Sequence, residues 1–439
     1  MSLASSKRWL FFILLVSFGI RFTGLNQIDG PVFDEVFYPN YGLMYLQGED
    51  FYYAHPPLAN YLYAFAIWLY SLLPFVGIES IQDIELSNLQ PISYRWINAL
   101  LGSLLCLVVY GISCQLTKNK IFALIAASLV VLDGSLIVDS RIALANTFLL
   151  FFGFSGLYFF LRFYLYNGGF HSLVFSGLLI AMAVSIKWSG LGFALLTLLI
   201  VLLIKNNPQT STKHINLNNA LLYTFTIIST YVAIFLPDIF LNSNYGFFEK
   251  HQQMLGFHQT MVSADEHPYC SKWHTWPFMI RPVGYFFESI PINQGGIVNS
   301  FKDIHLFPNP FIYLLSTLSI ILMIFQTLLS VFKKGDEDHQ KQLLQAFISL
   351  GYLANFLPWA FVERCLFLYH YQAASIFSFL AFAWYLSKLL SSKQLHYQAI
   401  FLMAVLTIVV SFLYWLPIQM GFEIPDTEFY RRMWFRSWI

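Results

Sequence analysis

Charged side chains are scarce in this sequence. Asp, Glu, Lys and Arg make up 11% of its 439 residues, whereas apolar residues make up 57% and aromatic residues 19%. Because a soluble globular domain carries roughly 25% charged residues, water is not the main solvent of this chain. The formal net charge is +1, and no loop carries a basic stripe with interleaved stacking aromatics. We therefore predict a membrane protein that does not bind nucleic acid.

Cysteine is also rare, and its spacing is not that of a zinc site. The four residues are Cys106, Cys114, Cys270 and Cys365, without a Cys-x-x-Cys pair or a nearby histidine pattern. The first two lie in one apolar run and are expected to be ordinary small hydrophobic residues. Free thiols are the main expectation for Cys270 and Cys365, which could also pair in an oxidising compartment.

Apolar residues recur in runs of about 17 to 25 residues, the length of a helix that crosses a hydrocarbon core of roughly 30 Å. Each backbone amide in lipid must be satisfied within its own segment, which favours helices over strands. We predict an all-α polytopic membrane protein with about eleven transmembrane helices. Residues 58–76 are instead expected to form an interfacial or re-entrant helix. The expected spans lie near residues 9–26, 94–115, 120–138, 142–164, 170–187, 189–204, 219–240, 310–332, 341–361, 365–387 and 397–417.

Two long polar segments divide the chain. Residues 1–240 are predicted to form an N-terminal transmembrane catalytic module that includes a first outer loop, residues 27–93. Residues 241–309 form a second long outer loop, and residues 310–439 form a C-terminal region of three or four helices with an outer tail. The first apolar run follows Lys7 and Arg8 as in a signal peptide, but no small-residue cleavage site follows it, so we predict a retained span.

Lysine and arginine divide unevenly between the two sides of the membrane when the N-terminus is placed in the cytoplasm. Eight of the twelve basic residues on the outer side are arginines, and 20 of the 23 acidic residues also fall there. The planar guanidinium of arginine binds phosphate through two parallel hydrogen bonds, so the excess of arginine indicates that an anionic substrate is bound at the outer surface. The greater length of the outer loops would also explain the excess. Ten of the twelve cytoplasmic basic residues are lysines in short loops: Lys7, Arg8, Lys118, Lys120, Arg162, Lys205, Lys213, Lys333, Lys334, Lys341, Lys388 and Lys393.

An acidic pair, Asp34-Glu35, opens the first outer loop. Adjacent residues point to different faces of a helix, so one carboxylate could face a cleft while the other anchors the loop. A carboxylate in a cleft could take the proton from an attacking hydroxyl, as a general base does. The alternative is that the pair only caps a short helix and interacts with its dipole.

Basic residues at the outer ends of helices are candidates for contacts with a donor phosphate or sugar. Each position has a structural alternative. Arg95 could extend its side chain to the membrane interface, and Arg141 could form an ion pair within its loop. Lys187 could reach the lipid headgroups from a helix end. A lysine at membrane depth is nevertheless a functional candidate by default. The full set of phosphate or sugar candidates is Arg95, Arg141, Lys187, Arg281 and Arg364.

Histidine and tyrosine residues in the outer loops could position an acceptor or the loops themselves. These candidates are His55, His267, Tyr269 and His370. His267 and His274 are seven residues apart, but Pro268 and Pro277 argue against one continuous helix that would stack them. We therefore predict no dedicated metal site, and metal binding by this loop is the alternative.

The ordered series of these motifs resembles the protein O-mannosyltransferase family, especially its bacterial and cyanobacterial-like, phospholipid carrier-dependent members. The resemblance covers nearly the whole chain, with two departures. Ala59-Asn60 stand where the family often has a lysine, and the large soluble module of the eukaryotic members is absent. The matching segments are Asp34-Glu35, His55-Pro56-Pro57-Leu58, Ser140-Arg141-Ile142 with Asn146, residues 185–191, His267-Pro268-Tyr269 and Arg432-Met433-Trp434.

The resemblance implies a type C glycosyltransferase fold, with the active site in the outer loops. It also implies a polyprenyl- or dolichyl-phosphate sugar, usually mannose, as donor and a Ser or Thr hydroxyl of a protein as acceptor. Asp34 would be the catalytic base, Glu35 would help to position a substrate, and Arg141 and Arg364 would contact phosphate.

We therefore predict an inverting glycosyltransferase that acts on the outer, periplasmic face of a bacterial-type plasma membrane. The alternatives are transfer of the sugar to a lipid or cell-envelope glycan, as in the related aminoarabinose transferases, and a membrane transporter. A transporter would place polar groups near the midplane between repeated helices, and no halves repeat here. No cofactor is expected to be essential, although a divalent cation could assist the leaving phosphate.

Overall fold

The computed structural model describes residues 3–74, 80–166, 168–203, 216–260, 267–291, 299–332 and 339–439. Four lysines expected on the cytoplasmic side, Lys205, Lys213, Lys333 and Lys334, lie outside the described residues.

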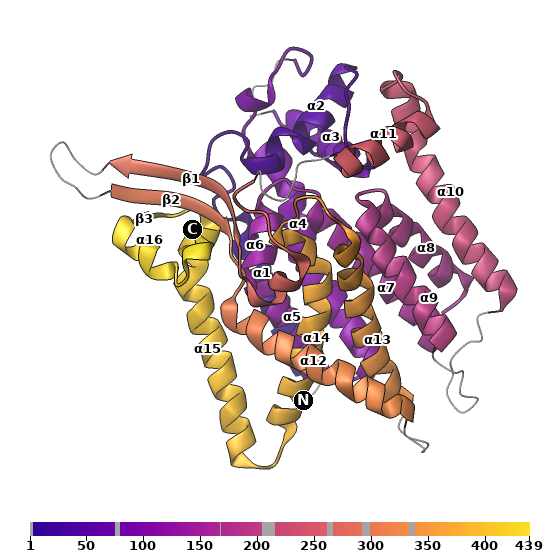
Figure 1. Cartoon of the computed structure of the whole chain (residues 1–439), viewed down its shortest axis with the longest axis vertical. Helices are drawn as coiled ribbons and strands as arrows, with labels where there is room; N and C mark the ends of the chain where they lie inside the picture. Colours follow the sequence, from indigo (N-terminus) through magenta and orange to yellow (C-terminus); the bar gives the residue numbers. More distant parts are fainter. Residues whose placement is uncertain are drawn as a thin grey trace.

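A bundle of helices forms the body of the molecule (Figure 1). They are α1 (Leu3–Phe22), α4 (Ile92–Thr117), α5 (Lys120–Leu132), α6 (Gly134–Arg141), α7 (Asn146–Tyr166), α8 (Phe170–Val184), α9 (Leu191–Leu203), α10 (Leu217–Leu241), α12 (Pro310–Phe332), α13 (His339–Phe356), α14 (Gln372–Ser391) and α15 (Leu395–Met420).

The described residues contain 7 helices long and apolar enough to cross a membrane, or up to 8 if the bent pair α5 and α6 counts as one span. The expectation of about eleven spans is therefore too high by this measure. Helices α8 and α9 have 15 and 13 residues, fewer than the roughly 20 that a full crossing needs. Helix α1 carries charged residues at both ends, Lys7 and Arg8 at one and Arg21 at the other.

Burial separates central helices from lipid-facing ones. The apolar windows of α7 and α14 are 72% buried, whereas those of α10 and α15 are 11% and 22% buried. A helix that is apolar all round and buried belongs to the core of a bundle. Helices α7 and α14 are therefore the centre of the bundle, and α10 and α15 lie at its periphery (Figure 1).

Asp133 causes the bend between α5 and α6, which is 59°. Its carboxylate accepts hydrogen bonds from Leu136 N at 3.2 Å and Ser135 Oγ at 2.5 Å. A side chain that caps the first amides of a new helix ends the previous one. The restart directs α6, with Asp139 and Arg141, toward the outer segments.

The two long polar segments and the C-terminal tail lie at one end of the bundle. In Figure 1, α2, α3, α11 and the strands occupy the upper part of the view, whereas the N-terminus lies at the lower end. Helix α2 crosses α3 closely at Gly42, where a Cβ atom would lie 2.7 Å from Ala64 N. The short elements of this end are η1 (Phe33–Val36), α2 (Tyr38–Gln47), α3 (Leu58–Ser71), η2 (Leu86–Asn88), η3 (Trp188–Gly190), α11 (Phe247–Thr260), η4 (Trp273–Phe278), η5 (Leu357–Phe361), η6 (Leu368–Tyr371), α16 (Asp426–Arg432) and η7 (Arg436–Trp438).

A three-stranded antiparallel sheet corrects the all-α prediction. Strand β1 (Val283–Pro291) pairs with β2 (Asn299–Leu306), from Val283 opposite Leu306 to Pro291 opposite Asn299. Strand β3 (Glu423–Pro425) pairs antiparallel with β2 and so ties the second outer loop to the C-terminal tail. Only segments that span the lipid must satisfy every backbone hydrogen bond internally. Outside the lipid, water can solvate the free backbone groups at the edges of a sheet, so strands are tolerated here.

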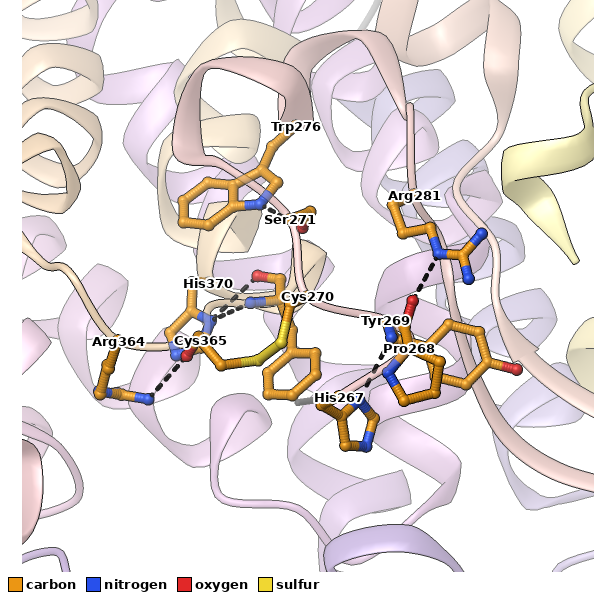
Figure 2. Close-up of a disulfide and its surroundings, with 11 residues drawn as sticks. His267, Pro268, Tyr269, Cys270, Ser271, Trp276, Arg281, Arg364, Cys365 and His370 are labelled. Carbon is orange, nitrogen blue, oxygen red and sulfur yellow. Dashed lines mark hydrogen bonds between the residues drawn. A yellow bond between two sulfur atoms is a disulfide. The ribbon is translucent and has the colours of Figure 1, made fainter. Parts of the chain in front are cut away.

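The second outer loop is also tied to the chain after α13 by a disulfide between Cys270 and Cys365, whose Cα atoms are 5.3 Å apart (Figure 2). The expectation of free thiols at these two positions is wrong, and the pairing that was left open is the one present. Cys106 and Cys114 are free, as expected.

Candidate active site

The two acidic residues of η1 have different surroundings. Glu35 is fully buried and accepts two hydrogen bonds from Arg95, from Nε at 2.8 Å and from Nη2 at 2.7 Å. It also accepts from Val32 N at 2.9 Å and Ala143 N at 2.7 Å. This bidentate pair joins η1 to α4 and to the segment after α6, so Glu35 anchors the loop.

The turn before Asp34 has an unusual backbone conformation. Phe33 has a φ of 51°, in the left-handed region that non-glycine residues rarely adopt. Its ring stacks on Tyr285 of β1 with centroids 4.4 Å apart and meets the edges of Phe367 and Tyr369 at 6.3 and 6.4 Å. Such strain persists only where the surroundings fix it, and it is typical of functional sites.

Asp34 is the acidic neighbour that remains without a partner. Among the described residues, no hydrogen bond or ion pair to its carboxylate is present, and the residue is half-buried. Burial raises the pKa of Asp34, and the charge of Lys187 opposes that rise. The side chain thus lies near a cation and away from bulk solvent.

Lys187 lies between α8 and η3. Its Nζ atom is 2.8 Å from Asn146 Oδ1 and lies 5.7 and 5.4 Å from the ring centroids of Tyr38 and Tyr369. Burial lowers the pKa of Lys187 to about 8, against the opposing charges of Asp34 and Asp139. A cation over aromatic faces is stabilised without being neutralised, so this ammonium can still bind an anion.

A chain of hydrogen bonds fixes the orientation of Asn146. Its Nδ2 atom donates to Asp139 Oδ2 at 2.8 Å, and the Tyr285 hydroxyl donates to the other oxygen of Asp139 at 2.6 Å. The amide oxygen of Asn146 is therefore left to face Lys187.

A cavity of about 570 Å³ opens beside Lys187. Aromatic and aliphatic side chains line it together with two cations, Lys187 and Arg364. Burial lowers the pKa of His55 well below its usual value, and burial lowers the pKa of His258 to about 4. Both imidazoles are thus neutral near pH 7, and the positive charge comes from Lys187 and Arg364. The lining residues are His55, Lys187, Trp188, Ser189, Leu255, His258, Gln259, Trp359, Phe361, Val362, Glu363, Arg364 and His370.

The remaining basic candidates lie elsewhere. Arg95 is 2% exposed and is held by Glu35 and three backbone carbonyls. Arg141 donates to the carbonyl oxygens of residues that end α1 and α15, among them Ile20 at 2.9 Å. Arg281 donates to the carbonyl oxygens of Pro268 and Ser437, both at 2.9 Å. These three guanidinium groups hold the backbone, and they do not line the cavity.

Of the histidine and tyrosine candidates in the outer loops, two line the cavity and two do not. His55 and His370 line the cavity. His267 accepts a hydrogen bond from Tyr269 N at 3.2 Å and packs edge-on against Phe367 at 5.0 Å, so the two residues shape the second outer loop. His267 and His274 do not share a helix, because η4 begins only at Trp273.

Several residues at the site were not among the candidates. Asp139 and Asn146 belong to a polar segment around Arg141 that the sequence marks as notable, but no specific role was predicted for either. Tyr38, Tyr285 and His258 carry no comparable signal, because each is one of many aromatic or polar residues in its loop. Only the folded chain brings the latter three to the site.

Two family models match this chain. Residues 11–242 match that of dolichyl-phosphate-mannose-protein mannosyltransferase. Residues 243–438 match that of the C-terminal four TMM region of protein-O-mannosyltransferase.

Known proteins match over most of the chain. The polyprenol-phosphate-mannose–protein mannosyltransferase of Corynebacterium glutamicum is 25% identical, over 95% of this chain and 91% of its own. The protein of the same name from Mycolicibacterium smegmatis is 22% identical, over 93% and 87%.

Solved structures share the fold. The protein O-mannosyltransferase Pmt1–Pmt2 complex of S. cerevisiae bound to the sugar donor superposes with a TM-score of 0.82 at 16% identity, over 100% of this chain and 93% of that chain. ArnT of Cupriavidus metallidurans bound to undecaprenyl phosphate has a TM-score of 0.54 at 14% identity, over 94% and 74%. These likenesses show that the fold is that of the type C glycosyltransferases.

Removal of one partner from the Glu35–Arg95 pair should destabilise the protein. Because Arg95→Ala leaves a buried carboxylate unpaired, we expect a loss of about 3–5 kcal/mol of stability, seen as a lower thermal unfolding midpoint of the detergent-purified protein. The control is Arg431→Ala, which breaks an ion pair whose arginine side chain is 71% exposed and should change the midpoint little. Equal shifts in the two variants would contradict the structural role of the buried pair.

Proposed function

This chain belongs to the protein O-mannosyltransferase family, and we propose that Asp34 and the cavity beside Lys187 and Arg364 form its active site. The chain is a polyprenol-phosphate-mannose-dependent protein O-mannosyltransferase. The observation that carries the site assignment is a half-buried carboxylate that has no hydrogen-bond or ion-pair partner among the described residues and that lies within reach of the charge of a buried lysine.

Asp34 acts as the general base in this proposal. Its carboxylate takes the proton from a Ser or Thr hydroxyl of the acceptor as the hydroxyl oxygen attacks the anomeric carbon of mannose. The bond between that carbon and the phosphate oxygen breaks on the opposite face, so the configuration inverts. A raised pKa makes the carboxylate a stronger base, and a free carboxylate can reach the hydroxyl.

Lys187 and Arg364 bind the phosphate of the donor and stabilise the departing polyprenyl phosphate. Positive groups placed where negative charge develops lower the barrier most when water is excluded and the groups need not reorient. The hydrogen bonds from Tyr285 through Asp139 to Asn146 hold Lys187 in place. Glu35 is a positioning residue, which fixes η1 through Arg95.

The histidines of the cavity contact the sugar or acceptor as neutral hydrogen-bonding groups. His55 and His370 line the cavity next to Lys187, and His267 and Tyr269 shape the second outer loop. We assign no phosphate contact to Arg95, Arg141 or Arg281, because their guanidinium groups are occupied by protein oxygens.

The reaction takes place on the outer face of a bacterial-type plasma membrane. The chain is a multi-pass membrane protein with bacterial relatives. The disulfide between the second outer loop and the segment after α13 favours an oxidising compartment for both, and the lysine-rich short loops favour the cytoplasm for the opposite end.

No metal ion is required in this proposal, because a lysine and an arginine supply the positive charge. Among the residues that the structure describes, no group of three or more His, Cys, Asp or Glu side chains converges to hold a metal ion. The phosphate leaves as a stable anion and needs no general acid.

Asp34→Asn should remove most of the transfer activity. Because a positioned base contributes roughly 10²- to 10⁴-fold, we expect a loss of that size in kcat with little change in stability. Transfer is measured with labelled polyprenyl-phosphate mannose and an acceptor protein, and the label should be released from the protein by base.

Asp83→Asn is the matched control, since Asp83 is an exposed acid of the same loop. It should retain full activity. Full activity of Asp34→Asn would remove the base assignment, and label recovered only in extracted lipid would point to a different acceptor.

The pH profile of kcat/KM should be bell-shaped. Asp34 acts when ionised and burial raises its pKa, so the acid limb should lie above the usual range for aspartate. Lys187 binds phosphate when protonated and burial lowers its pKa to about 8, so activity should fall as the pH rises above that value. Lys187→Arg should move the alkaline limb upward, because a guanidinium stays protonated. An unchanged alkaline limb in that variant would assign it to another group.

A further inference from the structure

The segment that carries Arg364 has little regular structure of its own. Residues 362–367 lie between η5 and η6, and a backbone hydrogen bond joins Leu366 O to Ser271 N of the second outer loop at 2.8 Å. The Arg364 guanidinium donates to the carbonyl oxygen of the adjacent Cys365 at 3.2 Å. Among the described residues no carboxylate forms an ion pair with Arg364. The position of its guanidinium therefore follows from the position of the backbone.

The disulfide is the covalent tie of this segment. Cys365 is the residue after Arg364, and its bond to Cys270 links positions 95 residues apart in the sequence. In Figure 2 the sulfur bridge lies between Arg364 and His370 on one side and the segment His267–Tyr269 on the other. A shift of the backbone at Cys365 would move Arg364 directly.

The Cys270 side of the bridge is well anchored. Trp276 is 1% exposed, its Nε1 atom donates to Ser271 Oγ at 2.9 Å, and its ring lies parallel to that of His370 at 6.0 Å. Pro277 O accepts a hydrogen bond from Thr317 of α12 at 3.1 Å. The bridge thus connects the Arg364 segment to a fixed point of the helical bundle.

We propose that the Cys270–Cys365 disulfide is a positioning element of the donor site, which holds Arg364 at the wall of the cavity where it meets the donor phosphate. This inference rests on the proposed function, since it requires Arg364 to contact that phosphate. A site must hold its groups within about 0.5 Å of the productive geometry. The segment has no regular secondary structure, and besides the packing of Leu366 and Phe367 only one backbone hydrogen bond between described residues joins it to the loop, so the covalent bridge is its strongest restraint. Loss of the bridge weakens donor binding and leaves the base, Asp34, in place.

The first test compares donor kinetics of the wild type and of Cys270→Ser/Cys365→Ser in native membranes. Because a displacement of about 1 Å can cost up to roughly 100-fold, we expect the KM for polyprenyl-phosphate mannose to rise about 10- to 100-fold. The kcat at saturating donor should fall as well, because Arg364 also stabilises the departing phosphate, whereas the acid limb of the pH profile should stay in place, since the base is not moved. Cys114→Ser, which replaces a free and half-buried thiol, is the control and should behave as wild type.

A double-mutant cycle separates positioning from general stability. Arg364→Ala should raise the donor KM at least as much as loss of the bridge. Removal of both cysteines in the Arg364→Ala background should add no further rise, because residues that act through one contact are not additive. Additive effects, or an unchanged donor KM together with a lower unfolding midpoint, would overturn the proposal and leave the bridge as a stabilising cross-link.

Reduction of the folded wild type avoids variants that fail to fold. Dithiothreitol gives two electrons and two protons to the bridge, which yields two cysteine thiols and the cyclic disulfide of the reagent. The donor KM should rise as in the double variant, and that variant should not respond. Full donor affinity in protein whose Cys270 and Cys365 are shown by thiol labelling to be free would overturn the proposal. Wild type that transfers no mannose from this donor would instead overturn the proposed function.

Discussion

The buried ion pair between Glu35 and Arg95 is the interaction on which the geometry of the site depends. It joins η1 to α4 inside the protein, where an unpaired partner would cost several kcal/mol. That penalty fixes the turn, including the unfavourable φ of 51° at Phe33. With Glu35 fully occupied, the neighbouring Asp34 lies within reach of the charge of Lys187 and has no hydrogen-bond partner in the described part of the chain. One carboxylate of the dipeptide provides rigidity, so that the other is free for chemistry.

Burial then sets the properties of the charged groups at the site. It raises the pKa of Asp34 and lowers the pKa of Lys187, and each charge partly offsets the effect of burial on the other. Burial also keeps His55 and His258 neutral by lowering their pKa values. The positive charge of the cavity wall therefore comes from Lys187 and Arg364, beside the exposed acidic residue Glu363, although three histidines also line the cavity.

The sequence predicts the two roles of Asp34-Glu35, because adjacent residues must face different ways, and it predicts a membrane bundle with polar segments at one end. It does not predict where each arginine points. Arg95 and Arg141 have the same signature as Arg364, a guanidinium at an outer helix end, but the first two bind oxygens of the protein itself. The partners come from segments far apart in the chain, such as Ala143 for Glu35. Only three-dimensional contacts distinguish an arginine held by several protein oxygens from Arg364, which donates to the carbonyl oxygen of its neighbour and lines the cavity.

The small number of cations at the cavity suits the change of charge in the proposed reaction. The donor is a phosphodiester with one negative charge, and the departing polyprenyl phosphate gains a second as the bond to mannose breaks. Lys187 and Arg364 therefore interact more strongly with the transition state than with the bound donor, and only such differential interactions accelerate the chemical step. Additional cations would also strengthen donor binding. Much of that gain would stabilise the bound donor and the transition state equally and would not accelerate the chemical step. Neutral histidines beside two cations thus favour turnover over retention of the donor.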